Sequence, residues 1–214
     1  MSERDRIMET DEKPTKRANY HHGDLRARLI DATRQLVEEK GPDHFSVSEA
    51  CRHAGVSTAA PYKHFKDKQE MLHEVAKEGM IRQREMLVAE LGLYPEATLE
   101  RIVAMGQVYV RYAMQETGVF RLIFGLSEQH QNDFELMDMG DKVFGLVKQE
   151  VASFAGRSEV TAADEHKAFL LWSFVHGLSF LQIDGKLEDK KLEIDLEAVL
   201  LDIARRVMFE VSAP

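Results

Sequence analysis

The segment from residue 62 to residue 68 carries side chains suited to binding a phosphate group. Tyr62 offers a hydroxyl, Lys63 and Lys68 offer ammonium groups, and His64 offers a ring N–H. All four can donate hydrogen bonds to an anion. Lys68 is predicted to lie at the start of a helix, where unpaired backbone N–H groups also attract negative charge.

A different chemistry, metal binding, is conceivable at Glu70 and His73. The spacing Glu-x-x-His is one half of a di-iron site in helical bundles, but such a site needs a second copy and two further glutamates. The sequence has no second Glu-x-x-His, no second histidine of the zinc-protease type after His73-Glu74, and no glycine-rich phosphate loop. A metalloenzyme therefore remains an alternative that a metal assay would test.

The phosphate-suited side chains follow two predicted helices. From Leu25 the apolar residues recur with helical spacing as far as Lys40, where Gly41-Pro42 ends the first helix. Ser46 and Glu49 have the spacing of a capping box and start a short second helix. Gly55 follows where a left-handed residue is needed to end it.

The donors themselves are predicted to lie on a third, brief helix. Ser57 or Thr58 can cap it, and it is expected to run through Tyr62 to about Phe65. Pro61 is tolerable because it falls in or just after the first turn.

The remainder of the chain is also predicted to be helical. Asp67 begins a long helix toward Leu91, and breaks occur near residues 117–118, 125–132, 155–161 and 184–189. No strand alternation and no internal repeat is found. The predicted fold class is therefore all-α, with about nine helices.

Composition is that of an ordinary globular protein. The chain has 214 residues, of which 44% are hydrophobic and 30% charged, outside the range typical of disorder. The single cysteine, Cys51, excludes an internal disulfide. Scattered charges at the start predict no signal peptide, and no run of 18 apolar residues is present, so we expect a cytoplasmic protein without a membrane span.

The net charge of -9 is unevenly distributed along the chain. From Lys13 to Lys68 there are eleven Lys and Arg against seven Asp and Glu, whereas from Ala76 to Pro214 there are fifteen against twenty-three. This asymmetry is expected if only the N-terminal end meets phosphate.

Two short helices joined by a tight turn, after a longer helix, form a helix-turn-helix arrangement, which can place its second helix in the DNA major groove. Helical hairpins are common, so spacing alone leaves DNA binding open. The sequence of residues 45–72, FSVSEACRHAGVSTAAPYKHFKDKQEML, resembles the TetR family. It contains a Gly-Val-Ser turn, a Tyr-x-x-Phe recognition helix and a Lys that opens the next helix. Residues 20–26, YHHGDLR, resemble one branch of the same family.

The resemblance implies a set of DNA contacts. Tyr62, Lys63, His64 and Lys68 would bind phosphates, whereas Thr58 and two alanines would face the bases. Alanine can contact only thymine methyl groups, so sequence choice would rest on Thr58, His64 and DNA shape. The full set of expected DNA-binding residues is Arg28, Ser46, Ser57, Thr58, Ala59, Ala60, Tyr62, Lys63, His64 and Lys68.

The C-terminal part is similar to the Trp-His-Gly type of TetR C-terminal domain, through Trp172, His176 and Gly177. The resemblance implies an Ω-shaped homodimer that pairs through the last two helices, at about 162–183 and 191–209. The first of these helices is apolar on nearly every side, as is expected of a helix that packs against its own subunit on one side and against the partner subunit on the other. The expected organisation is an arm over 1–19, a helix-turn-helix domain over 20–78, and a sensing and dimerisation domain over 79–214.

Between the two ends lies a set of flexible and aromatic side chains. The resemblance implies a mostly apolar pocket for a small-molecule effector, with no other cofactor and no metal, whereas the simpler interpretation is ordinary bundle core. His176 is equally consistent with a packed, hydrogen-bonded histidine. The pocket candidates are Met105, Tyr109, Tyr112, Phe120, Phe124, Phe144, Trp172 and His176.

The sequence thus predicts a transcriptional regulator that binds a palindromic double-stranded DNA operator as a dimer and is released by a small ligand. Repression is the family default. The alternatives are a helical-bundle metalloenzyme and a dimeric scaffold that does not bind DNA.

Overall fold

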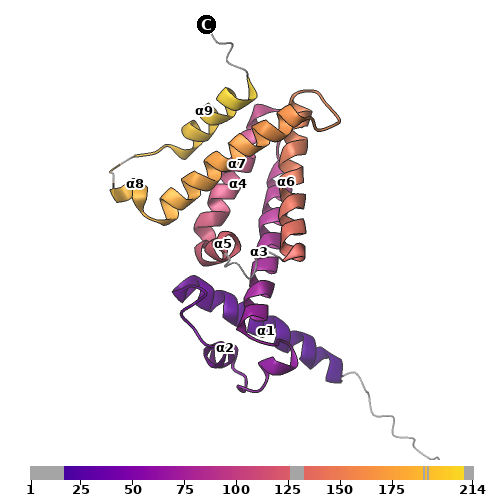
Figure 1. Ribbon diagram of the computed structural model, residues 1–214, viewed down its shortest axis with the longest axis vertical. Helices are drawn as coiled ribbons and strands as arrows, with labels where there is room; N and C mark the ends of the chain where they lie inside the picture. Colours follow the sequence, from indigo (N-terminus) through magenta and orange to yellow (C-terminus); the bar gives the residue numbers. More distant parts are fainter. Residues whose placement is uncertain (1–16, 126–132, 190, 192, 210–214) are drawn as a thin grey trace, which may run out of the picture.

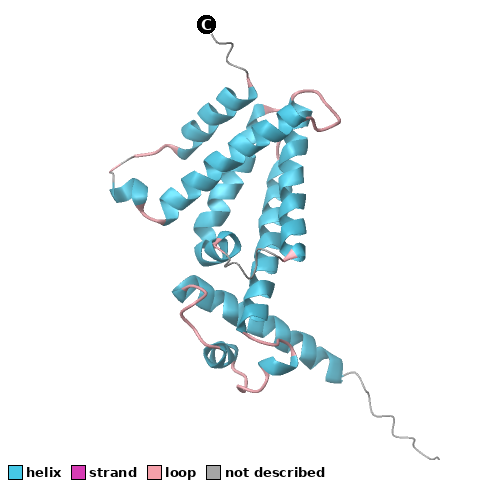
Figure 2. Cartoon of the chain, in the orientation of Figure 1, coloured by secondary structure: helices cyan, strands magenta, loops and turns pink. Residues whose placement is uncertain are grey.

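The computed structural model describes residues 17–125, 133–189, 191 and 193–209, and every regular element in these ranges is helical (Figure 2). This confirms the all-α fold class. None of the described helices has the length and apolarity needed to cross a membrane. The elements are α1 (Arg17–Lys40), α2 (Val47–Ala54), the 3-10 turn η1 (Pro61–Lys63), α3 (Lys68–Leu91), α4 (Leu99–Gln115), α5 (Thr117–Phe124), α6 (Phe134–Phe154), α7 (Ala162–Ile183), α8 (Lys186–Asp189) and α9 (Leu196–Met208).

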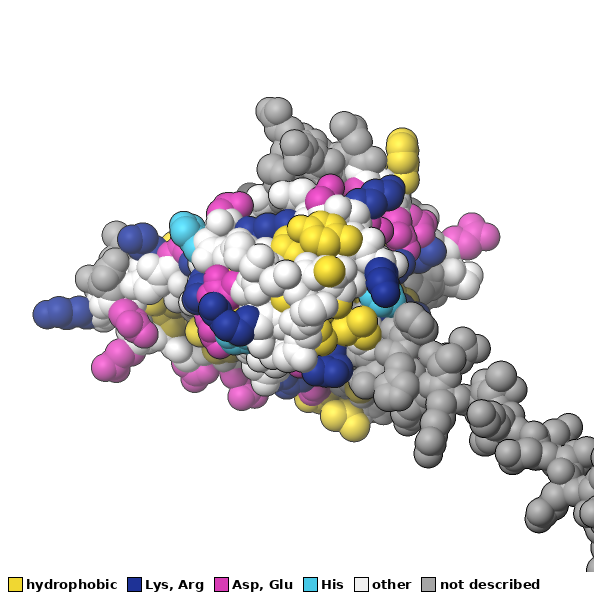
Figure 3. Space-filling view, turned by 90° about the horizontal axis from the view of Figure 1, so that it is seen from below, with side chains coloured by type: hydrophobic (Ala, Val, Ile, Leu, Met, Phe, Trp, Pro, Cys, Tyr) yellow, Lys and Arg dark blue, Asp and Glu magenta, His cyan; other side chains and the backbone are white. Residues whose placement is uncertain are grey.

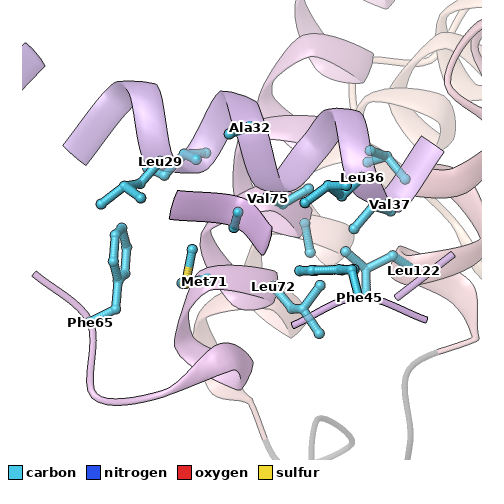
Figure 4. Packing of buried hydrophobic residues seen from close by; sticks show 14 of the residues in the cluster. Leu29, Ala32, Leu36, Val37, Phe45, Phe65, Met71, Leu72, Val75 and Leu122 are labelled. Carbon is cyan, nitrogen blue, oxygen red and sulfur yellow. The ribbon is translucent and has the colours of Figure 1, made fainter. Parts of the chain in front are cut away.

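An N-terminal head is formed by α1, α2, η1 and the first half of α3, and lies at one end of the molecule (Figure 1). Its core joins one face of α1 to the start of α3, with Phe45 and Phe65 closing the two sides (Figure 4). Leu29, Leu36 and Met71 are fully buried there. Burial of a side chain of this size contributes about 1.5–3 kcal/mol, so a small domain can hold its shape.

The first helix begins earlier than predicted. Apolar periodicity starts at Leu25 and residues up to Asn19 were expected to form an arm, but α1 already begins at Arg17. Extending an existing helix costs far less than nucleating one, so polar residues can join the first turns without an apolar face of their own. Residues 1–16 of the expected arm lie outside the described residues.

The predicted third helix is wrong in extent and in its cap. Residues 57–60 form a turn closed by Ala60 N–H on the Ser57 carbonyl, and only the single 3-10 turn η1 follows. Neither Ser57 nor Thr58 caps it, since the residue at its N-cap is Ala60. Pro61 has no N–H, so the hydrogen bond that would continue the first turn into a helix cannot form.

A C-terminal bundle is formed by the second half of α3 together with α4–α9 (Figure 1). Helix α4 lies at its centre, in contact with α3, α6, α7 and α9. A capping box starts α7, because the Thr161 side chain accepts from Asp164 N–H and the Asp164 carboxylate accepts from Thr161 N–H. Arg157 pairs with Asp164, which is buried.

Several contacts join the head to the bundle. Helix α3 runs continuously from one to the other, and α1 packs directly on α5. At the second contact Gly118 lies against the backbone of Val37 and Glu38, where a side chain on residue 118 would clash. The Glu38 carboxylate accepts hydrogen bonds from the backbone N–H groups of Gly118 and Val119, at 2.8 and 2.9 Å.

Candidate nucleic-acid interface and small-molecule cavity

Helix α2 is positioned by local chemistry at both of its ends. The Ser46 side chain caps it by accepting from Glu49 N–H at 3.2 Å, and Gly55 ends it with a left-handed φ of 65°. The Glu49 carboxylate pairs with Lys40 instead of returning to Ser46, so only half of the predicted capping box forms. Arg28 donates a hydrogen bond to the Ala54 carbonyl, which ties α1 to the end of α2.

The segment after α2 presents its side chains to solvent. Tyr62 is 66% exposed although it is aromatic, and Lys63 beside it is also exposed. Pro61 and Phe65 on either side of them are buried and anchor the segment to the head. Of the ten expected DNA-binding residues, Ala60, His64 and Lys68 are partly buried and the others are exposed: Arg28, Ser46, Ser57, Thr58, Ala59, Tyr62 and Lys63.

Lys68 has a structural partner inside the head. Its ammonium donates to the Phe45 carbonyl at 2.7 Å and lies over the Phe45 ring, 4.2 Å from its centroid. Burial lowers the pKa of Lys68 below its ordinary value. An ammonium has three donors, so two N–H groups remain beyond this bond.

Figure 3 shows the end of the molecule that carries the head, with basic side chains lying among exposed apolar ones. Arg52, His53 and Lys66 are exposed in addition to the expected set. The Arg52 side chain is 77% exposed and contacts Glu49 at 3.6 Å. Arg52 and His53 lie on the solvent-exposed face of α2, and Lys66 lies in the turn before α3. None of these three residues was predicted from the sequence to contact DNA.

A cavity of about 310 Å³ lies in the bundle, at the lower end of the range for small-molecule pockets of ~300–1,000 Å³. Side chains from five helices line it, and most of them are apolar. Its wall consists of Met80, Gln83 and Leu87 on α3, Met105, Val108 and Tyr109 on α4, Phe124 on α5, Gly140, Asp141, Val143, Phe144 and Val147 on α6, and Trp172 on α7.

Five of the eight pocket candidates therefore line this cavity: Met105, Tyr109, Phe124, Phe144 and Trp172. The other three are packed outside its wall. Tyr112 and Phe120 are fully buried in a separate cluster of the core. His176 lies within an aromatic cluster and bonds through Nδ1 to the Tyr109 hydroxyl at 2.8 Å. Burial lowers the pKa of His176, which favours the neutral ring.

Two polar residues of the cavity wall were not among the candidates. Gln83 is a buried polar side chain on the apolar face of α3, between Met80 and Leu87. Asp141 lies on α6 and is exposed. The signal for Gln83 was a polar residue in an apolar helical stripe, but periodicity alone does not show which stripe faces a cavity.

The outer face of α7 is apolar and exposed. Phe169, Leu170 and Leu181 are 52%, 41% and 45% exposed. Gly177 shares the face of Leu170 and Leu181 by helical spacing, and nothing lies within 4 Å of the place where its side chain would be. Such a stripe is unusual on a monomer surface and is typical of a helix that packs against another one.

The metal alternative has no support in the described part of the chain, which contains no group of three or more His, Cys, Asp or Glu able to hold an ion. The Glu70 carboxylate accepts from Lys66 N–H at 2.6 Å. His73 pairs with Asp133 at 2.8 Å. Both residues of the Glu-x-x-His pattern therefore have local structural partners.

Comparisons with known proteins agree with this architecture. Residues 29–75 match the family described as "Bacterial regulatory proteins, tetR family", and residues 102–206 match "Tetracyclin repressor-like, C-terminal domain". A comparison with curated proteins found no match.

Several solved structures share the fold. A protein of unknown function from Rhodococcus sp. RHA1 is 26% identical, with a TM-score of 0.74, over 89% of this chain and 97% of that one. A tetR-family transcriptional regulator from Streptomyces coelicolor is 15% identical, with a TM-score of 0.67, over 86% and 79%. A putative transcriptional regulator from Saccharomonospora viridis, in complex with choline, is 18% identical, with a TM-score of 0.71, over 86% and 97%.

Proposed function

Since the chain belongs to the TetR family of DNA-binding transcriptional regulators, we propose that it is a repressor that binds a palindromic operator as a homodimer and is released by a small, mostly apolar ligand. The observation that carries this proposal is the segment 57–63 at the end of the head, in which all side chains except those of Ala60 and Pro61 are exposed. Tyr62 is 66% exposed there, beside Lys63, and both are held in place by buried neighbours.

The roles of these side chains follow from their chemistry. Tyr62 and Lys63 donate to backbone phosphates and set the position of the head on the duplex. Thr58 and Ala59, which are exposed in the preceding turn, contact base edges. Lys68 holds the head together through Phe45 and uses its remaining N–H groups on phosphate.

The dimer is supported by the outer face of α7. One short turn of protein reads few bases, whereas two heads related by a two-fold axis read half-sites about 34–36 Å apart. Burying Phe169, Leu170 and Leu181 against the same face of a second copy removes exposed apolar area, and Gly177 permits close approach of the two helices.

Ligand release is supported by the course of α3. Met71, Leu72 and Val75 on this helix belong to the core of the head, whereas Gln83 and Leu87 line the cavity. A ligand that favours a different position of α3 therefore changes the position of the head and disfavours the DNA-bound spacing. The choline complex from S. viridis supports the idea that proteins of this fold accommodate small organic molecules.

The test is a selection of random duplex DNA on the purified protein at near-physiological salt, followed by sequencing. We expect enrichment of a palindrome with half-sites one helical turn apart. A variant with Tyr62→Ala and Lys63→Ala should lose the enrichment, whereas Lys142→Ala, an exposed lysine of the bundle, should retain it. Absence of any enrichment for the unaltered protein would favour the scaffold alternative.

A further inference from the structure

The cavity wall has few hydrogen-bonding groups, and these differ in whether they already have a partner. The Tyr109 hydroxyl already has two partners, since it accepts from Trp172 Nε1 at 3.3 Å and bonds to His176 Nδ1 at 2.8 Å. Gln83 differs, because its side-chain Nε2 is buried without a hydrogen-bond partner among the described residues.

An unpaired amide in this position is costly to the empty protein. Gln83 is only 6% exposed, so bulk water does not compensate it, and buried donors are nearly always paired. Because Gln83 lines the cavity, a ligand acceptor that reaches this amide by a small turn of the side chain would restore the missing bond. The amide therefore points to a polar group on an otherwise apolar ligand.

The charges around the cavity disfavour an anion. Asp141 is the one ionisable carboxylate on the wall, and no lysine or arginine of the described residues lines it. Four cations on α3 and α6 are held by carboxylates: Lys77 by Glu135, Arg82 by Glu116, Lys142 by Asp138 and Lys148 by Glu165. Arg84, also on α3, is exposed and is not part of the wall. A ligand carboxylate would lose its hydration and gain no cation in return.

We propose that the cavity binds a largely apolar small molecule without an anionic group, whose single carbonyl-type acceptor pairs with the Gln83 amide, and that it discriminates against carboxylates. This inference rests on the proposed function, because it specifies the class of the effector that releases DNA. Gln83 is the specificity-determining residue, and Asp141 adds to the discrimination by charge.

Three probes with a shared skeleton separate these contributions. 4-Phenyl-2-butanone carries a ketone, 3-phenylpropanoate replaces its methyl group by an anionic oxygen, and butylbenzene replaces the carbonyl by a methylene. Binding is followed by the fluorescence of Trp172, which is the only tryptophan of the chain and part of the cavity wall, and is checked by calorimetry.

We expect the ketone to bind and the carboxylate to bind at least about tenfold more weakly. Gln83→Leu, which keeps the volume, should weaken ketone binding about five- to tenfold and leave butylbenzene within about twofold. Gln69→Leu, an exposed glutamine on the same helix, is the matched control and should change neither. Asp141→Asn should reduce the ratio of the carboxylate Kd to the ketone Kd by about two- to threefold. The effect is this small because Asp141 is exposed.

The proposal is wrong if none of the probes binds, if the carboxylate binds as tightly as the ketone, or if Gln83→Leu weakens all probes alike. Circular dichroism of each variant identifies a folding defect, and butylbenzene binding shows that the cavity of Gln83→Leu is intact. Because the assay contains no DNA, its failure is separate from failure of the proposed function: a protein that selects a palindrome but rejects the probes is a regulator with another class of ligand.

Discussion

Replacing Glu38 by alanine should destabilise the whole chain, although this residue is only partly buried and lies in the last turn of α1, where an acidic side chain does not favour its own helix. Its carboxylate accepts from two backbone N–H groups at the start of α5. The residue before α5, Glu116, makes no side-chain capping bond, because its carboxylate pairs with Arg82. Glu38 is therefore the group that caps α5.

The magnitude follows from these two bonds. Hydrogen bonds to a charged group contribute about 1.5–3 kcal/mol when buried. Since Glu38 is partly exposed, we take about 1 kcal/mol for each bond, which agrees with the loss of a helix cap. The expected loss is about 2 kcal/mol, or a fall in Tm of about 4–8 °C for a chain of this size.

The assay is urea and thermal unfolding at a fixed protein concentration, because the proposed dimerisation would make Tm depend on concentration. Glu39→Ala removes an exposed acid one residue away and serves as the control. Glu38→Gln keeps one acceptor oxygen and should give an intermediate loss. If Glu38→Ala and Glu39→Ala unfold alike, the carboxylate does not hold α5 and the reasoning fails.

Three further outcomes are expected. Lys63→Ala should weaken binding to all duplexes alike and lower the slope of log affinity against log salt by about one; a changed sequence preference, seen by repeating the selection, would contradict a phosphate role. Asp164→Asn should cost about 2 kcal/mol of unfolding free energy at pH 7, because Arg157 helps to hold the pKa of Asp164 at about 2, below its usual 3.8. This contribution is present above pH ~4 and disappears as the pH falls toward 2, so urea midpoints of the two proteins should converge in acid. Leu170→Glu should give a monomer in sedimentation experiments, whereas Glu165→Gln, exposed on the same helix, should leave the dimer intact.

Helix ends were predictable where they depend on neighbouring residues. Ser46 caps α2, Gly55 ends it and the Thr161-Asp164 box starts α7, because each of these requires only side chains within a few positions. The same locality explains the error at η1. Pro61 shortens the element because it has no backbone N–H to donate to the preceding turn. A prediction from cap residues alone does not take this missing hydrogen bond into account.

The cavity could be predicted only in outline. Aromatic and methionine side chains between residues 105 and 176 are the right types for its wall, and five of the eight candidates line it. Tyr112 and Phe120 have the same chemistry but face the core, since the side that a residue presents depends on how α4 and α5 are rotated against their neighbours. Gln83 and Asp141 could not be predicted as wall residues, because they line the cavity only through the way in which α3 and α6 pack against each other.

Helix α5 makes the connection between cavity and head short. It has eight residues, and Phe124 at its end lines the cavity, while Gly118 near its start lies against α1. At ~1.5 Å per residue these two positions are about 9 Å apart along the helix. A helix of this length moves as one body, because its hydrogen bonds span most of it. If the proposed ligand displaces Phe124, it would act on the same helix whose first N–H groups are held by Glu38, and it would reach the head through α5 as well as through α3.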